Sequence, residues 1–191
     1  GEVSERPDMP GYAAIYDGTT ILAACGKDEY ASENNNHGVF TSLLVEALYG
    51  GAMNLLGDVT PGSIYSYIDQ SLGAWEQRPV FKANIKEFVS LRKNNPPIAV
   101  NDLRKITSLF ASPAAELQLD PTYEPDKHEA DTDEINEKHE RDFSLLQCYV
   151  KLNLVVPVGE DHMYYAAIRR KSCKLTAQGQ HYWMLVNKNQ I

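Results

Sequence analysis

The sequence predicts an α/β fold followed by a small, mainly helical tail. A short apolar run at residues 21–25, bounded by turn-forming residues, is typical of a buried strand. After a polar loop, apolar residues from Phe40 to Leu48 recur at helical spacing until Gly50 and Gly51 end the pattern. The composition changes again at residues 94–97, Asn-Asn-Pro-Pro, which predicts a domain boundary. A strand, a loop and a helix therefore come first, and a different module follows.

Bulk composition narrows the class of protein. A length of 191 residues holds one sizeable domain or two small ones, and 43% hydrophobic content is enough for a packed core. The formal charge of -8 argues against a dedicated nucleic-acid binder. No apolar run reaches the roughly eighteen residues of a membrane span, and no signal peptide is recognisable, so we expect a cytoplasmic protein without a membrane partner. The first residue is Gly1 rather than Met, which indicates a tag remnant or a fragment released by cleavage.

The three cysteines, Cys25, Cys148 and Cys173, show no CxxC spacing. An odd number without such spacing predicts neither a disulfide framework nor a zinc site, and it favours a reducing compartment. The histidines show no metal-ligand spacing either. We therefore expect no cofactor on this chain.

Local signals place the elements of the first region. Asp17 and Gly18 form a hairpin turn, Thr60 caps a helix whose first position suits Pro61, and Pro79 marks the entry to an edge strand. The expected order is an exposed lead-in (1–11), a strand (12–16), a strand (19–25), a helix (39–49), a helix (61–73), an edge strand entered at 78–81 and a short strand (88–91).

The tail has a different pattern. Residues 94–142 read as a linker that holds a short helix capped by Asp102 and an acidic stretch at 126–142. A helix from Phe143, a strand or turn at 155–159, a helix at 162–170, a strand at 172–175 and a helix at 176–186 capped by Thr176 follow. This order within residues 143–191 indicates a winged-helix-like module.

The run ILAACGKDEYASENNNHGVFTSLLVEALYG resembles the beginning of the small subunit of caspase-like cysteine peptidases, in particular their metacaspase-like bacterial branch. In that family a core strand leads into an A-x-E loop, here Ala31-Ser32-Glu33, and then into an H-G-x-F-T helix start, here at 37–41. The later sequence Gln-Arg-Pro-Val at 77–80 fits the same order. The resemblance covers residues 12–93 and implies one half of a caspase-like α/β sandwich. In the tail, KLTAQGQHYWMLV is similar to the last helix of winged-helix modules.

The resemblance has consequences for activity. Caspase-like peptidases carry their catalytic His and Cys on a large subunit, upstream of the strand with which this chain begins. No histidine precedes His37, so the resemblance implies that this chain alone is inactive. Its expected partners are a large catalytic subunit cut from the same precursor and a protein or peptide substrate. Metacaspase-like enzymes often depend on calcium, and the resemblance places such calcium ligands on the large subunit.

Cys25 allows two interpretations. The sequence ACG echoes the Q-A-C-x-G signature of the caspase nucleophile, and His37 follows as a potential base. A cysteine that closes an apolar run is, however, usually a small buried hydrophobe, and in the family this strand follows the nucleophile strand. We favour the second interpretation, with His37 at a helix start or in the core.

Glu33 is the candidate specificity residue. Ungapped counting places it where caspases have the pocket arginine that pairs with a substrate aspartate. A carboxylate there would pair with guanidinium or ammonium groups, which predicts cleavage after Arg or Lys. Asp28 and Glu29 would deepen the negative field. The alternative is that Glu33 caps or ion-pairs with a neighbouring element, and that Asp28 and Glu29 form a solvated loop face.

Backbone recognition is expected beside Glu33. Tyr30, Ala31 and Ser32 would present their main chain to an extended peptide substrate, which adds to the sheet as a strand. Main-chain hydrogen bonds would then provide affinity while the pocket provides specificity.

The tail holds two further clusters. The first is basic, and it would contact phosphate in a DNA-binding module, although such a run is more often a solvated helix end. The second is aromatic and predicts a core and rim that also suit a regulatory protein partner. Their members are Arg169, Arg170, Lys171 and Lys174, and Tyr164, Tyr165, Tyr182 and Trp183.

Two other functions stay open. One is a non-catalytic caspase-like pseudoenzyme or adaptor whose sheet is an interaction scaffold. The other is a regulator that binds DNA through the C-terminal module, which would show salt-dependent DNA retention.

Overall fold

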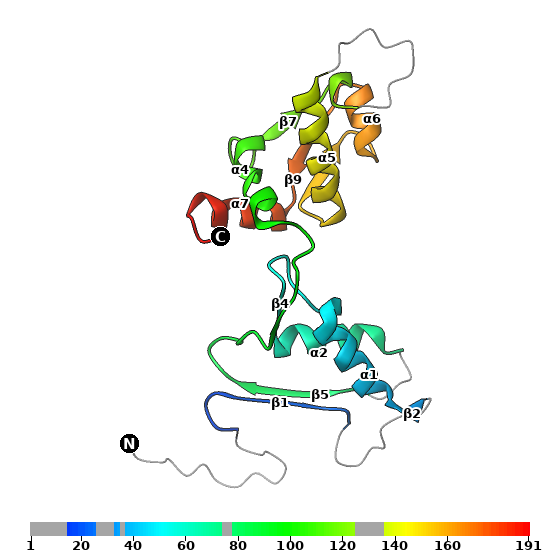
Figure 1. Cartoon of the computed structure of the whole chain (residues 1–191), viewed down its shortest axis with the longest axis vertical. Helices are drawn as coiled ribbons and strands as arrows, with labels where there is room; N and C mark the ends of the chain where they lie inside the picture. The colour runs from blue at the N-terminus through cyan, green and yellow to red at the C-terminus, as the bar shows by residue number, and fades with distance from the viewer. Residues whose placement is uncertain (1–14, 26–32, 35–36, 74–77, 125–135) are drawn as a thin grey trace. The chain divides into compact units, whose positions relative to one another are not determined.

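The computed structural model describes residues 15–25, 33–34, 37–73, 78–124 and 136–191. Within these ranges the protein is a mixed α/β structure of short helices and small antiparallel sheets (Figure 1). It divides into two units, Gly1–Pro97 and Ile98–Ile191. Segment 94–97, where the sequence predicts a boundary, lies at the end of the first unit. Among the described residues, no helix is both long enough and apolar enough to cross a membrane.

The first unit contains a two-stranded antiparallel sheet of β1 (Thr19–Ala23) and β5 (Val80–Asn84). The predicted turn before β1 is present, and Gly18 adopts φ +82°, a left-handed conformation that costs glycine little. Most of the predicted strand at 12–16 lies outside the described residues, and its described part, residues 15–16, belongs to no strand. β1 pairs with β5. Pairing with β5 brings an aromatic side chain, Phe81, against a helix.

Two helices cover one face of this sheet, α1 (Val39–Glu46) and α2 (Pro61–Ser71) (Figure 1). α1 continues into the π-helical turn η1 (Ala47–Gly51), in which Gly50 has φ +124°. The predicted cap of α2 is confirmed. The Ser63 backbone N–H donates to the Thr60 hydroxyl at 3.2 Å, and the Thr60 N–H donates to the Ser63 hydroxyl at 3.0 Å.

The core of the first unit lies between the helices and the sheet. Leu22 of β1 packs against a fully buried cluster of Ala47, Val59, Ile64 and Ile68. Tyr65 of α2 stacks on Phe81 of β5, with ring centroids 4.9 Å apart. Leu22 and Phe81 are cross-strand partners, so both point toward the helices.

The two-residue alternation of a strand determines which side chains lie on the opposite face of the sheet. Ile21 and Ala23 of β1 and their partners Lys82 and Val80 point away from the helices. No described helix of the first unit lies over this face, and Ile21 is 43% exposed (Figure 1). The described residues of the first unit therefore cover the β1–β5 sheet on one side only.

Two short ladders complete the first unit: β2 (Glu33–Asn34) with β3 (His37–Gly38), and β4 (Asp58–Val59) with β6 (Arg92–Lys93). The predicted strand at 88–91 is wrong, because regular pairing begins at residue 92. Residues 86–93 are all exposed, so no buried face fixes the register of this segment.

The second unit contains a three-stranded antiparallel sheet in the order β7-β9-β8. The helices and strands predicted for residues 143–191 are confirmed, but the first helix begins earlier than predicted, at Glu137, within the segment predicted as a linker. In chain order the elements are α3 (Val100–Arg104), α4 (Ile106–Leu109), β7 (Glu116–Gln118), the 3-10 turn η2 (Pro121–Tyr123), α5 (Glu137–Lys151), β8 (Val155–Val158), α6 (Met163–Ile168), β9 (Ser172–Leu175) and α7 (Ala177–Asn187).

The predicted linker, 94–142, differs from what the structure shows. Residues 98–124 are part of the packed second unit, and Tyr149 of α5 donates its hydroxyl to the Asp102 carbonyl at 2.6 Å. Asp102 does not cap α3, which begins after Ala99, and its carboxylate instead pairs with Lys105 at 2.7 Å. The fully buried apolar side chains of this part are Leu103, Ile106, Phe110 and Leu119.

The first turn of helix α7 lies very close to the backbone of Leu154, the residue before β8. Thr176 caps the helix as predicted and accepts the Gly179 N–H at 3.0 Å. A Cβ atom at residue 179 would lie 2.0 Å from the Leu154 carbonyl oxygen, so only glycine fits. The Trp183 indole N–H donates to the Phe110 carbonyl at 2.8 Å and ties α7 to the end of α4.

Candidate substrate-binding loop and its surroundings

The predicted substrate-binding residues lie between β1 and α1. Asp28, Tyr30, Ala31 and Ser32 fall outside the described residues. The backbone of Glu33 belongs to β2, where it pairs with Gly38, the residue that precedes the first turn of α1. The side chain of Glu33 lies outside the described part, so its role in a pocket stays a prediction.

Cys25 follows the end of β1 and is half-buried, with a free thiol. It is less enclosed than the fully buried core residue that the favoured interpretation expects. His37 belongs to β3, immediately before the helix start, and its side chain is outside the described part. Because the His37 side chain is not described, no distance between it and the Cys25 thiol tests either interpretation.

Arg78, from the family pattern, has a defined structural role. Its guanidinium donates to the backbone oxygen of Asp69 at 2.7 Å and to the Asp69 carboxylate at 3.0 Å. The two side chains are 47% and 41% exposed, so the ion pair is screened by solvent and stabilises the unit only modestly. Arg78 thus ties the entrance of β5 to the last turns of α2.

The second unit contains a hydrogen-bonded chain of three side chains that no sequence pattern predicts. The Asp120 carboxylate accepts the backbone N–H of Thr122 at 2.9 Å and its hydroxyl at 2.5 Å. The same hydroxyl oxygen lies 2.6 Å from Nδ1 of His139, and the Tyr123 ring stacks on the imidazole with centroids 4.1 Å apart. His139 is distant in sequence from the other two residues, so no motif could indicate the contact.

The chemistry of the Asp120–Thr122–His139 hydrogen bonds depends on which atoms carry the protons. Burial alone would raise the pKa of Asp120, but the hydrogen bonds from Thr122 and the nearby His139 and Arg170 hold the pKa below its ordinary value. An ionised Asp120 takes the single hydroxyl proton of Thr122, so Nδ1 of His139 must carry a proton and donate it. His139 cannot then act as a base toward Thr122. The arrangement fastens α5 to η2 and does not form a nucleophile-base pair.

The basic cluster of the tail is partly engaged. Arg169 pairs with Glu160 at 2.8 Å, and its guanidinium lies 4.9 Å from the Tyr165 ring centre. Arg169 also follows the last residue of α6, where a cation is favourable. These contacts agree with a solvated helix end, the more frequent role of such a basic run, rather than with a phosphate site.

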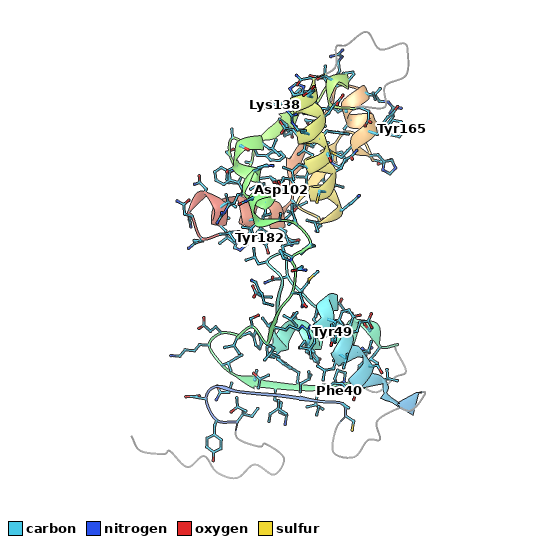
Figure 2. All side chains as sticks on the ribbon, in the orientation of Figure 1. Phe40, Tyr49, Asp102, Lys138, Tyr165 and Tyr182 are labelled. Atoms are coloured by element: carbon cyan, nitrogen blue, oxygen red, sulfur yellow. The ribbon has the colours of Figure 1, made fainter. Side chains whose placement is uncertain are left out.

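None of the four predicted aromatic residues is fully buried, because three are half-buried and Tyr165 is exposed. Burial raises the pKa of the Tyr182 hydroxyl, whereas Tyr165 is 43% exposed and makes an edge contact with Tyr164 at 5.3 Å. Figure 2 labels Tyr165 on α6 and Tyr182 on α7. In the part of the chain that is described, no group of three His, Cys, Asp or Glu side chains is arranged to hold a metal ion.

Comparison with known proteins adds no assignment. No protein-family model matches the chain, and no curated protein matches its sequence.

Proposed function

We propose that this chain is the small-subunit half of a caspase-like cysteine endopeptidase that cleaves after Arg or Lys. The observation that carries the proposal is the β1–β5 sheet, which has helices on one face and an exposed Ile21 on the other. An α/β sandwich buries both faces of its sheet, so a half-covered sheet fits a unit that is completed by a second polypeptide.

The order of the elements supports the same proposal. β1 ends, the loop with the A-x-E pattern follows, and α1 begins at Val39. In this proposal the loop lines the substrate groove, Tyr30 to Ser32 pair with the peptide backbone, and Glu33 holds the basic side chain of the substrate. A large subunit from the same precursor supplies the catalytic Cys and His, and any calcium ligands.

The second unit is proposed as a winged-helix-like module that docks a regulatory protein. Its three-stranded sheet is antiparallel, and helices precede and follow it in the chain. The engaged Arg169 favours a protein partner over DNA.

Co-expression with the upstream half tests the activity. We expect the complex to hydrolyse fluorogenic peptides that end in Arg or Lys and to spare those that end in Asp. Glu33→Gln removes the charge with little change in shape, and the kcat/KM for Arg peptides should fall about 30- to 150-fold, because a charged hydrogen bond contributes roughly 2–3 kcal/mol. Asp161→Asn, at an exposed site of the second unit, removes a carboxylate in the same way, is the matched control and should leave kcat/KM unchanged.

Two results would count against the proposal. Preferential cleavage after Asp, or unchanged Arg cleavage in a folded Glu33→Gln complex, contradicts the charge argument. A complex that forms but hydrolyses none of the peptides favours the alternative function, a non-catalytic scaffold that uses the same half-covered sheet. If the upstream half lacks a paired His and Cys, the non-catalytic scaffold is the correct function.

A further inference from the structure

One exposed segment of the first unit carries three large apolar side chains. Residues 86–93, between β5 and the end of β6, are exposed without interruption. Phe88 is 42% exposed, Val89 68% and Leu91 54%. Surface hydrophobic residues are normally scattered singly, so three within four positions indicate an interaction site.

The segment is held in place from its inner side. The Phe88 ring lies 6.0 Å from the ring of Phe81 and covers Gly62, where an added Cβ would approach it to 2.8 Å. Leu91 donates its backbone N–H to the Val59 carbonyl at 2.8 Å. Val89 and Leu91 are therefore presented outward by a segment that is anchored at both ends.

Unpaired backbone groups distinguish between kinds of partner. Apart from β4, no described strand pairs with β6, and the backbone of Phe88 and Val89 makes no hydrogen bond within the described residues. A lipid surface would leave such groups unsatisfied in an apolar medium. An extended peptide supplies complementary N–H and C=O groups as it adds along a free edge. The backbone therefore favours a peptide over a membrane.

The charge around the segment favours an acidic peptide. Between residues 82 and 93 the basic side chains are Lys82, Lys86, Arg92 and Lys93, and Glu87 is the single acid, in a chain of formal charge -8. Lys93 pairs with Asp58 at 2.9 Å, and Arg92 lies 4.2 Å from the ring centre of Tyr49, which Figure 2 labels. With Lys93 neutralised by Asp58, the three other basic side chains face two nearby acids, Glu87 and Asp17, and this small excess of positive charge steers an acidic partner toward this edge.

An open pocket of about 570 Å³ lies beside the segment. Pro61, Ile85, Phe88 and Val89 contribute apolar walls. Asp17, which also lines the pocket, accepts a hydrogen bond from the Asn84 amide at 2.9 Å. The pocket has room for an apolar side chain of a bound peptide.

We propose that residues 86–93, together with this pocket, bind an extended segment of another protein in which apolar and acidic residues alternate. The peptide lies along the free edge of β6, covers Val89 and Leu91 with apolar side chains, and directs its carboxylates to Lys86 and Arg92. The inference is independent of the peptidase proposal, because it uses no residue of the predicted substrate loop.

Fluorescence anisotropy with the full chain tests this binding. The probe is a short fluorescein-labelled peptide that alternates Val and Glu. We expect saturable binding that weakens as salt is added, and at least tenfold weaker binding of the same peptide with Lys in place of Glu. N-methylation of alternate backbone nitrogens of the probe should weaken binding to a similar extent, because it removes the backbone donors of an added strand.

Variants locate the site. The double variant Val89→Ser and Leu91→Ser changes exposed side chains, and its folding is checked by circular dichroism. It should bind the probe at least tenfold more weakly, whereas Val45→Ser, at a 46% exposed position on α1, should bind as the parent chain does. The double variant Lys86→Glu and Arg92→Glu should bind the Glu-containing peptide more weakly and the Lys-containing peptide more tightly.

Several results would overturn the proposal. They are the absence of binding, equal affinity for the Glu and Lys probes, full binding of the N-methylated probe, and an unaffected double variant. Self-association of the chain that the double variant abolishes would assign the surface to a second copy instead. Cosedimentation with phosphatidylserine vesicles that the double variant abolishes would assign it to a membrane.

Discussion

Replacement of Gly179 by alanine gives the sharpest test of the packing in the second unit. An alanine Cβ would lie 2.0 Å from the Leu154 carbonyl oxygen, far inside van der Waals contact. That oxygen belongs to the backbone and already accepts the Thr176 N–H at 3.0 Å. It therefore cannot rotate away as the end of a side chain could. Helix α7 must shift instead.

The expected loss follows from opposing effects. Alanine favours a helix over glycine by about 1 kcal/mol. Overpacking costs about 1–3 kcal/mol, and the shift also breaks the Thr176 hydrogen bond and the cap, each worth about 1 kcal/mol. Gly179→Ala should therefore lower the free energy of unfolding of this unit by about 2–4 kcal/mol, although helix propensity alone predicts stabilisation.

Urea denaturation followed by Trp183 fluorescence measures this loss, in a background where the other tryptophan, Trp75, is replaced by Phe. Gln178→Ala, at an exposed position in the same turn, is the control and should stay within about 0.5 kcal/mol of the parent. An unchanged or raised midpoint for Gly179→Ala would refute the close approach of α7 to Leu154.

Three further predictions concern single side chains. Tyr149→Phe should cost about 1–3 kcal/mol in urea denaturation, because the Asp102 carbonyl loses its 2.6 Å hydrogen bond, and a loss below about 0.5 kcal/mol would contradict that bond. Burial raises the pKa of the Cys173 thiol from 9.0 to about 12, so the contribution of this thiol to stability is complete below pH 9 and is lost as the pH rises toward 12. Cys173 should also resist a thiol reagent at pH 8 until the protein unfolds, and rapid labelling under native conditions would argue against its burial. Thr60→Ala should destabilise the first unit by about 1 kcal/mol through the loss of the α2 cap, as hydrogen exchange of α2 amides can measure.

The candidate site shows where inference from sequence succeeds only in part. The residue pattern around Glu33 predicts a strand, a loop and a helix, and β1 and α1 are present in that order. The pattern holds no information on the Asp69 partner of Arg78 or on the chain from Asp120 to His139. Both depend on residues that the folded backbone brings together across many positions.

By itself the sequence determined the features that rest on neighbouring residues. Thr60 and Thr176 cap helices because a hydroxyl reaches an N–H within the same turn, and Gly18 forms a turn because it lacks a Cβ. Only the tertiary structure decided that β1 pairs with β5 and that residues 98–124 belong to a packed unit. These outcomes depend on which apolar surfaces are buried together, and that burial is a property of the whole chain rather than of any short window.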